Sequence, residues 1–167
     1  GKRAIIHYMQ PHEPYIGATV TGPGFERPTS AGFRQGVNVG TPPNHIVRKT
    51  LEILSGLFYW FGIRGNYYIW KIRELLEMTP AGPMDAVRRK YGVEKLKEAY
   101  KENLEIVLGY VAEVVENLTG RIVVTADHGE MLGENNKFCH WSRATEKQLR
   151  EVPWLVIDKG QRCVQPP

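Results

Sequence analysis

Residues 121–130 read Arg-Ile-Val-Val-Thr-Ala-Asp-His-Gly-Glu, an apolar run that leads directly into a cluster of polar side chains. The continuous β-branched run at 121–126 is typical of a strand that is buried on both faces, as strands of parallel sheets are. From Gly92 onward the preceding residues carry apolar side chains every three or four positions, which predicts a long helix ending near Leu118 to Gly120. A helix followed by a buried strand favours an α/β fold.

Two further strands are predicted near the ends of the chain. Residues 4–9 form a short apolar run, and residues 151–157 form another, in which Pro153 must lie at the start because proline cannot donate to a sheet. We expect residues 4–9, 121–126 and 154–157 to share one sheet. The predicted fold class is therefore α/β, with a mostly parallel sheet and helices packed on it.

The region between the first two strands differs in composition. Residues 16–43 are rich in Gly, Pro, Thr and Ser without a sustained period, which predicts a long loop. Residues 44–78 carry aromatic and aliphatic side chains at helical spacing and predict two helices with a break near residues 62–66. Residues 1–167 are thus interpreted as a single domain with a loop and helical excursion at about residues 16–92.

Composition limits the classes of function. The 167 residues include 22 Lys and Arg against 18 Asp and Glu, and the net charge of +4 is scattered, which argues against a nucleic-acid partner. No stretch approaches the roughly 20 apolar residues of a membrane span, so no membrane segment is expected. With two cysteines that lack CxxC spacing and no signal peptide at the start, a reducing, cytoplasmic location is the default expectation.

Asp127 and His128 are the first candidates for a functional site. They follow the best predicted strand, where α/β sheets place their ligands, and Gly129 after them permits a tight turn. A carboxylate and an imidazole side by side can both bind one divalent ion. The alternative from the residues alone is a solvated turn in which the aspartate caps the backbone.

Three stretches of the chain resemble one known family. Residues 125–134, Thr-Ala-Asp-His-Gly-Glu-Met-Leu-Gly-Glu, resemble the signature strand and loop of sulfatase-like hydrolases of the alkaline phosphatase superfamily. Residues 7–15, in which His12 lies between two prolines, are similar to the family's motif that faces the bound ester. Lys137 and His140 stand roughly where the family has a Lys or His, and residues 149–155 resemble the segment that returns to the sheet.

The resemblance implies metal-dependent hydrolysis of sulfuric or phosphoric esters of small molecules or glycans. Asp127 and His128 would bind the metal, and His12 would protonate the leaving alkoxide. Lys137 and His140 would neutralise the ester oxygens. We expect the three histidines and Asp127 to converge on one cleft.

The metal itself stays open between Ca, Mn, Zn and Mg. A single ion is favoured, because the segment with His7 and His12 offers no aspartate for a second one. His7 and His140 are the residues that would serve a second metal or the substrate. Cys139 is either a soft metal ligand or, by preference, a small core residue.

No nucleophile is identified in this chain. The family carries its Thr, Ser or modified Cys upstream of the histidine-proline motif, so the chain is interpreted as the C-terminal portion of an alkaline-phosphatase-like domain whose N-terminal half is missing. Such a portion is expected to be inactive alone and to expose apolar residues, which allows homo-oligomers. The alternative function is that of a non-catalytic binding or scaffolding relative that kept the fold.

Overall fold

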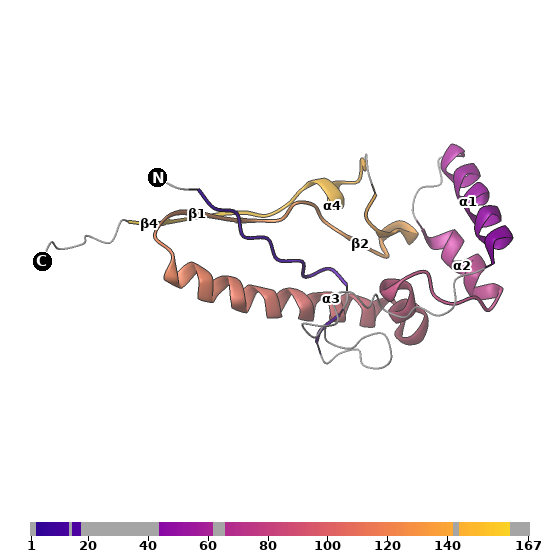
Figure 1. The fold of residues 1–167 in the computed structure, drawn as a ribbon, viewed down its shortest axis with the longest axis horizontal. Helices are drawn as coiled ribbons and strands as arrows, with labels where there is room; N and C mark the ends of the chain where they lie inside the picture. Colours follow the sequence, from indigo (N-terminus) through magenta and orange to yellow (C-terminus); the bar gives the residue numbers. More distant parts are fainter. Residues whose placement is uncertain (1–2, 14, 18–43, 62–65, 142–143, 161–167) are drawn as a thin grey trace, which may run out of the picture.

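One long helix organises the molecule, which we describe from a computed structural model for residues 3–13, 15–17, 44–61, 66–141 and 144–160. This helix, α3, spans Pro83–Asn117 and runs along most of the structure (Figure 1). Proline at its first position and Asp85 in its first turn both suit a helix N-terminus. The helix kinks at Gly92, where φ is 85° and ψ is 173°, a backbone conformation open essentially to glycine alone.

Two shorter helices lie at one end of α3. Helix α1 spans His45–Trp60 and helix α2 spans Tyr67–Leu75, so the predicted break falls between them. The side chain of Asn44 caps α1, because its Oδ1 accepts the backbone N–H groups of Ile46 at 2.7 Å and Val47 at 3.3 Å.

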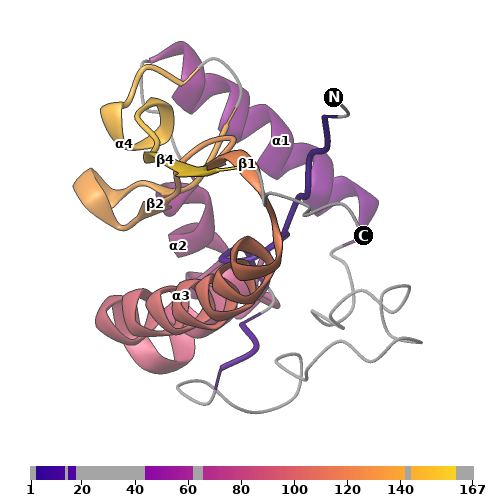
Figure 2. The same ribbon diagram turned by 90° about the vertical axis from the view of Figure 1, so that its left-hand side faces the viewer.

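The strands form two small antiparallel pairs. In chain order, the elements after α3 are β1 (Gly120–Thr125), β2 (Met131–Leu132), η2 (Glu134–Asn136), β3 (Phe138–Cys139), α4 (Lys147–Arg150) and β4 (Trp154–Lys159). Strand β1 pairs with β4 so that Val123 lies opposite Val156, and β2 pairs with β3. The β1–β4 ribbon lies along one side of α3, as the end-on view of that helix shows (Figure 2).

The predicted fold class, a mostly parallel sheet, is wrong. Residues 4–9 form no strand, and no two strands of the described residues pair in parallel. A β-branched run favours an extended backbone but does not fix the direction of its partner, which here returns antiparallel. Nor is the ribbon buried on both faces, since Val123 is 40% exposed and Leu155 is 55% exposed. The fold therefore lends no support to an alkaline-phosphatase-like sheet.

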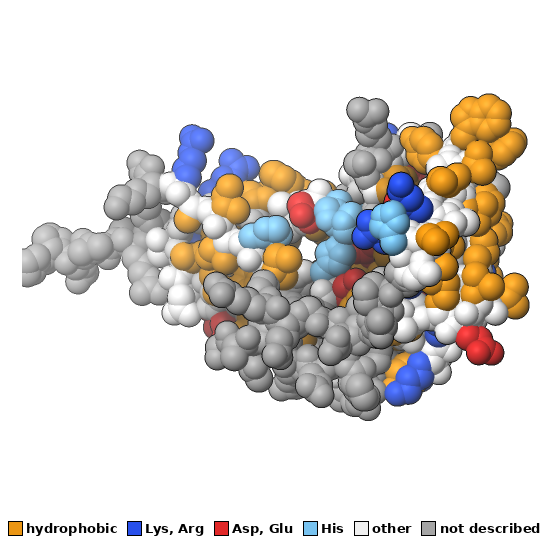
Figure 3. Space-filling model, turned by 45° about the vertical axis from the view of Figure 1, so that its right-hand side comes forward, with side chains coloured by type: hydrophobic (Ala, Val, Ile, Leu, Met, Phe, Trp, Pro, Cys, Tyr) orange, Lys and Arg blue, Asp and Glu red, His pale blue; other side chains and the backbone are white. Residues whose placement is uncertain are grey.

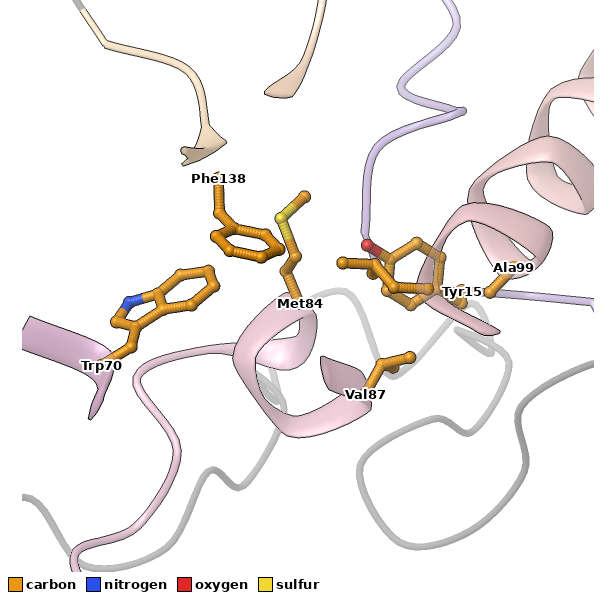
Figure 4. Packing of buried hydrophobic residues seen from close by; sticks show 7 residues of the cluster. Tyr15, Trp70, Met84, Val87, Ala99 and Phe138 are labelled. Atoms are coloured by element: carbon orange, nitrogen blue, oxygen red, sulfur yellow. The ribbon is translucent and has the colours of Figure 1, made fainter. Parts of the chain in front are cut away.

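The apolar core lies where α2, α3 and β3 meet. Figure 4 shows Trp70 of α2 and Met84 of α3 beside Phe138 of β3. Tyr15, from the segment before α1, packs against α3 further along that helix. The buried cluster consists of Tyr15, Trp70, Met84, Val87, Leu96, Ala99 and Phe138. Two of its members, Tyr15 and Phe138, lie within three residues of candidate site histidines, so the same packing that forms the core also fixes the segments that carry the site.

Residues 18–43, where most of the long loop is predicted, lie outside the described residues. Among the helices of the described ranges, none has the length and apolarity needed to cross a membrane.

Candidate metal centre

Three histidines from distant parts of the chain meet in space. His12 belongs to the segment before α1, His128 follows β1, and His140 follows β3. Their ring centroids lie 4.1 Å apart for His128 and His140, 4.9 Å for His12 and His140, and 5.8 Å for His12 and His128. One ligand nitrogen from each lies within 4.8 Å of the others, and Figure 3 shows histidine side chains gathered beside acidic ones on this face. We call these three residues the histidine cluster.

Glu130 joins two members of the cluster. Its Oε2 lies 3.2 Å from Nε2 of His12, and its Oε1 lies 3.2 Å from Nδ1 of His140. The carboxylate side chain is only 2% exposed, so these imidazoles are its main compensation for lost hydration. Glu130 thereby fixes the orientation of both rings.

His128 is oriented by the backbone instead. Its Nδ1 lies 2.8 Å from the carbonyl oxygen of Gly129, and a hydrogen bond to that acceptor requires the proton on Nδ1, which leaves a lone pair on Nε2. In each ring of the cluster, one nitrogen thus faces a protein acceptor and the other nitrogen can serve as a metal ligand. Histidines that bind metals in proteins almost always have this arrangement.

The loop that carries His12 is anchored to α3 through a buried asparagine. Asn103 is fully buried, and its Nδ2 donates to the carbonyl oxygens of His12 at 3.1 Å and Pro11 at 3.3 Å. Its Oδ1 accepts the backbone N–H of Ile16 at 2.8 Å. The sequence motifs did not single out Asn103, although a polar residue on an otherwise apolar helix stripe was the available signal.

A second anchor lies one residue beyond His12. Oε2 of Glu13 accepts the backbone N–H of Met84 at 2.7 Å, in the first turn of α3, where no side chain of the helix itself provides a cap. Burial raises the pKa of Glu13, and the Met84 bond partly opposes this shift. The backbone around His12 is therefore held from both sides.

Burial also affects the protonation of His12. It lowers the pKa of His12, and the neighbouring His140 and His128 act in the same direction, while Glu130 opposes them. The net shift is downward, so His12 is neutral around pH 7. Neutral imidazole is the form that binds metal ions.

Asp127 lies beside the cluster rather than between its rings. Its side chain is 63% exposed, with Oδ2 at 3.7 Å from Nε2 of His128 and 3.9 Å from Nε2 of His7. Partial burial raises the pKa of Asp127, but His128 and two backbone N–H groups outweigh that effect and the pKa is lowered. Asp127 is a charged carboxylate on the open side of the site, with His7 next to it.

Lys137 and Cys139, also considered from the sequence, have other partners. Nζ of Lys137 lies 2.7 Å from Glu146, and it lies 5.9 Å from the ring centre of Trp141. Sγ of Cys139 lies 3.7 Å from the sulfur of Met84, and burial raises the pKa of its thiol to about 12. A thiol that stays protonated is a poor metal ligand, which favours the core interpretation of Cys139.

Gly129 holds the β1 end of the site against α4. Its N–H donates to the carbonyl of Leu149 at 3.2 Å, and a Cβ at this position would collide with the backbone carbonyl oxygen of Gln148. We expect Gly129→Ala to lower the free energy of unfolding by about 2–4 kcal/mol, because two backbone segments must separate. Urea unfolding measures this loss.

Gly109→Ala is the matched control, since Gly109 lies in α3 with nothing within 4 Å of an added Cβ. In a helix this change should stabilise the protein by about 0.5–1 kcal/mol. Equal effects of the two substitutions would contradict the close approach of α4 to Gly129.

Comparison of the chain with models of known protein families, with curated proteins and with solved structures finds no match. The similarity of residues 125–134 to sulfatase-like hydrolases thus stays a prediction.

Proposed function

We propose that the histidine cluster binds one divalent transition-metal ion and that this ion serves the hydrolysis of phosphoric or sulfuric esters. The observation that carries the proposal is the pairing of every cluster imidazole with a protein acceptor: Glu130 for His12 and His140, and the Gly129 carbonyl for His128. These acceptors leave one nitrogen of each ring for an ion, in a group that is already compact.

The donor set favours zinc-like ions over calcium or magnesium. Imidazole nitrogen suits zinc and its transition-metal neighbours, whereas calcium and magnesium prefer shells of oxygen ligands. The lowered pKa of His12 reduces the competition from protons at this ligand near neutral pH. Asp127 would supply a carboxylate on the open side of the ion, where a substrate must enter.

A bound ion of this kind would polarise the ester and offset the negative charge that develops on its oxygens. The chain's own residues would keep the imidazoles in place, through Glu130 on one side and Asn103 behind the His12 loop. The choice of ester rests on the similarity of residues 125–134 to sulfatase-like hydrolases. Among the described residues we assign no nucleophile.

Metal titration and hydrolysis assays test the two parts of the proposal separately. Calorimetry should give zinc binding at least about 100-fold tighter than calcium binding, because the cluster offers three nitrogen donors. Joined to the N-terminal half and the nucleophile that the resemblance implies, the chain should hydrolyse 4-nitrophenyl phosphate or 4-nitrophenyl sulfate, lose this activity with a chelator and regain it with zinc.

The outcomes are distinguishable. Absence of zinc binding by the folded chain would refute both the metal site and the metal-dependent hydrolysis. Tight zinc binding without hydrolysis of either ester would refute the hydrolase part and support a non-catalytic metal-binding protein.

A further inference from the structure

Helix α1 has two apolar faces, and only one of them is covered. Leu51 is buried against the rest of the molecule. On the adjacent face Ile46 is 71% exposed, Ile53 65%, Leu57 48% and Trp60 78%. We call these four residues the α1 stripe; Figure 3 shows hydrophobic side chains covering the side of the molecule where α1 lies.

The spacing of the α1 stripe is that of a helix-pairing seam. Together with Thr50, its members recur at alternating intervals of four and three residues over two heptads, the repeat by which two helices pack side by side. Thr50 fits this seam because its hydroxyl already donates to the carbonyl of Ile46 at 3.0 Å. Its burial would therefore leave no donor without a partner.

The residues that border the α1 stripe favour a second helix of the same kind. Gly56 has nothing within 4 Å of an added Cβ, so another backbone can approach closely there. In an antiparallel pair Lys49 of one copy would lie near Gly56 of the other, and no like charges would meet. The remaining charges near the middle of α1, Arg48 and Glu52, already pair within the chain at 3.4 Å.

The exposed area lies toward the lower end of what dimer interfaces bury. From the exposed fractions, the four side chains offer roughly 500–600 Å² per chain, somewhat below the roughly 800 Å² per partner of a standard interface. A membrane-bound helix, by contrast, usually carries several unpaired Lys or Arg on its polar face, whereas α1 has two such residues, Arg48 and Lys49, and Arg48 is paired with Glu52. We infer that the α1 stripe binds the same stripe of a second copy of this chain across a two-fold axis.

Sedimentation velocity over a concentration series tests this interface. The full chain should dimerise with a dissociation constant on the order of micromolar, and Leu57→Glu should weaken the dimer at least about 10-fold by placing charge in the seam. Leu108→Glu is the matched control, because Leu108 lies on α3 and is 46% exposed, against 48% for Leu57. It should leave the dissociation constant unchanged, and circular dichroism should give equal helix content for all three proteins.

Three results would overturn the inference. One is a monomer at 100-fold higher concentration than the expected dissociation constant. Another is equal weakening by Leu57→Glu and Leu108→Glu. The third is a monomer that sediments with phosphatidylcholine and phosphatidylglycerol vesicles and is released from them by Leu57→Glu, which would assign the stripe to a lipid surface. None of these measurements depends on metal binding.

Discussion

Replacing His12 with alanine should remove most of the bound metal. His12 provides one of three imidazoles in the histidine cluster, and its buried partner Glu130 would lose one of the two imidazole contacts that it makes among the described residues. Loss of an oriented ligand should weaken zinc binding by at least about 100-fold, since even changes in the surrounding residues cost 10–100-fold. Calorimetric titration and elemental analysis of the purified variant measure the loss.

His45→Ala is the matched control for this substitution. His45 is the exposed first residue of α1, so its loss should leave metal content unchanged. If His12→Ala instead leaves the metal content unchanged, the result favours the interpretation made from the sequence, in which His12 acts as the general acid. In that case His12→Ala would keep its metal and slow esters with poor leaving groups most, while Asp127→Ala would lose metal and activity together.

Replacing Asp85 with alanine should cause the largest loss of stability. Asp85 is fully buried in the first turn of α3, with Oδ1 at 2.8 Å from Arg88 and Oδ2 at 2.8 Å from Arg89. Both arginine side chains are themselves largely buried, so removal of the carboxylate leaves two cationic groups that are compensated only in part. Arg88 keeps its contact with Glu74 at 2.8 Å, and Arg89 keeps the carbonyl oxygens of Met78 and Trp70. We expect the free energy of unfolding to fall by about 3–5 kcal/mol, as measured by urea denaturation.

The Arg121–Asp158 pair provides the comparison. Its atoms lie 3.7 Å apart, and both side chains are more than 70% exposed, so Asp158→Ala should change stability little. Similar losses for Asp85→Ala and Asp158→Ala would contradict the conclusion that the buried carboxylate of Asp85 stabilises the start of α3 more than an exposed ion pair does.

The sequence predicted the positions of most helices and strands correctly, but it did not predict how the strands pair. Helical spacing located α1, α2 and the part of α3 after Gly92, and the β-branched run located β1 within one residue. These patterns depend on near neighbours in the chain. The direction of β4 depends on contacts between residues more than 28 positions apart, which periodicity does not encode, and the parallel sheet was predicted wrongly for that reason.

For the site, the sequence motifs identified the three histidines but not the residues that hold them in place. His12, His128 and His140 were selected from short sequence patterns, and the structure brings them together. The anchoring of His12 by Asn103 follows from the packing of α3 against the segment 3–13, and the placement of Asp127 follows from the turn after β1. Such packing is a property of the assembled molecule and leaves only a weak trace in local sequence.

The kink at Gly92 lies between the two points at which the His12 loop is attached to α3. Glu13 bonds to Met84, ahead of the kink, and Asn103 bonds to His12 and its neighbours, behind it. The loop therefore spans the kink, with one attachment point on each side of it. A change in the angle between the two halves of α3 would move these two attachment points relative to each other, so the position of His12 depends on a glycine 80 residues away in the chain.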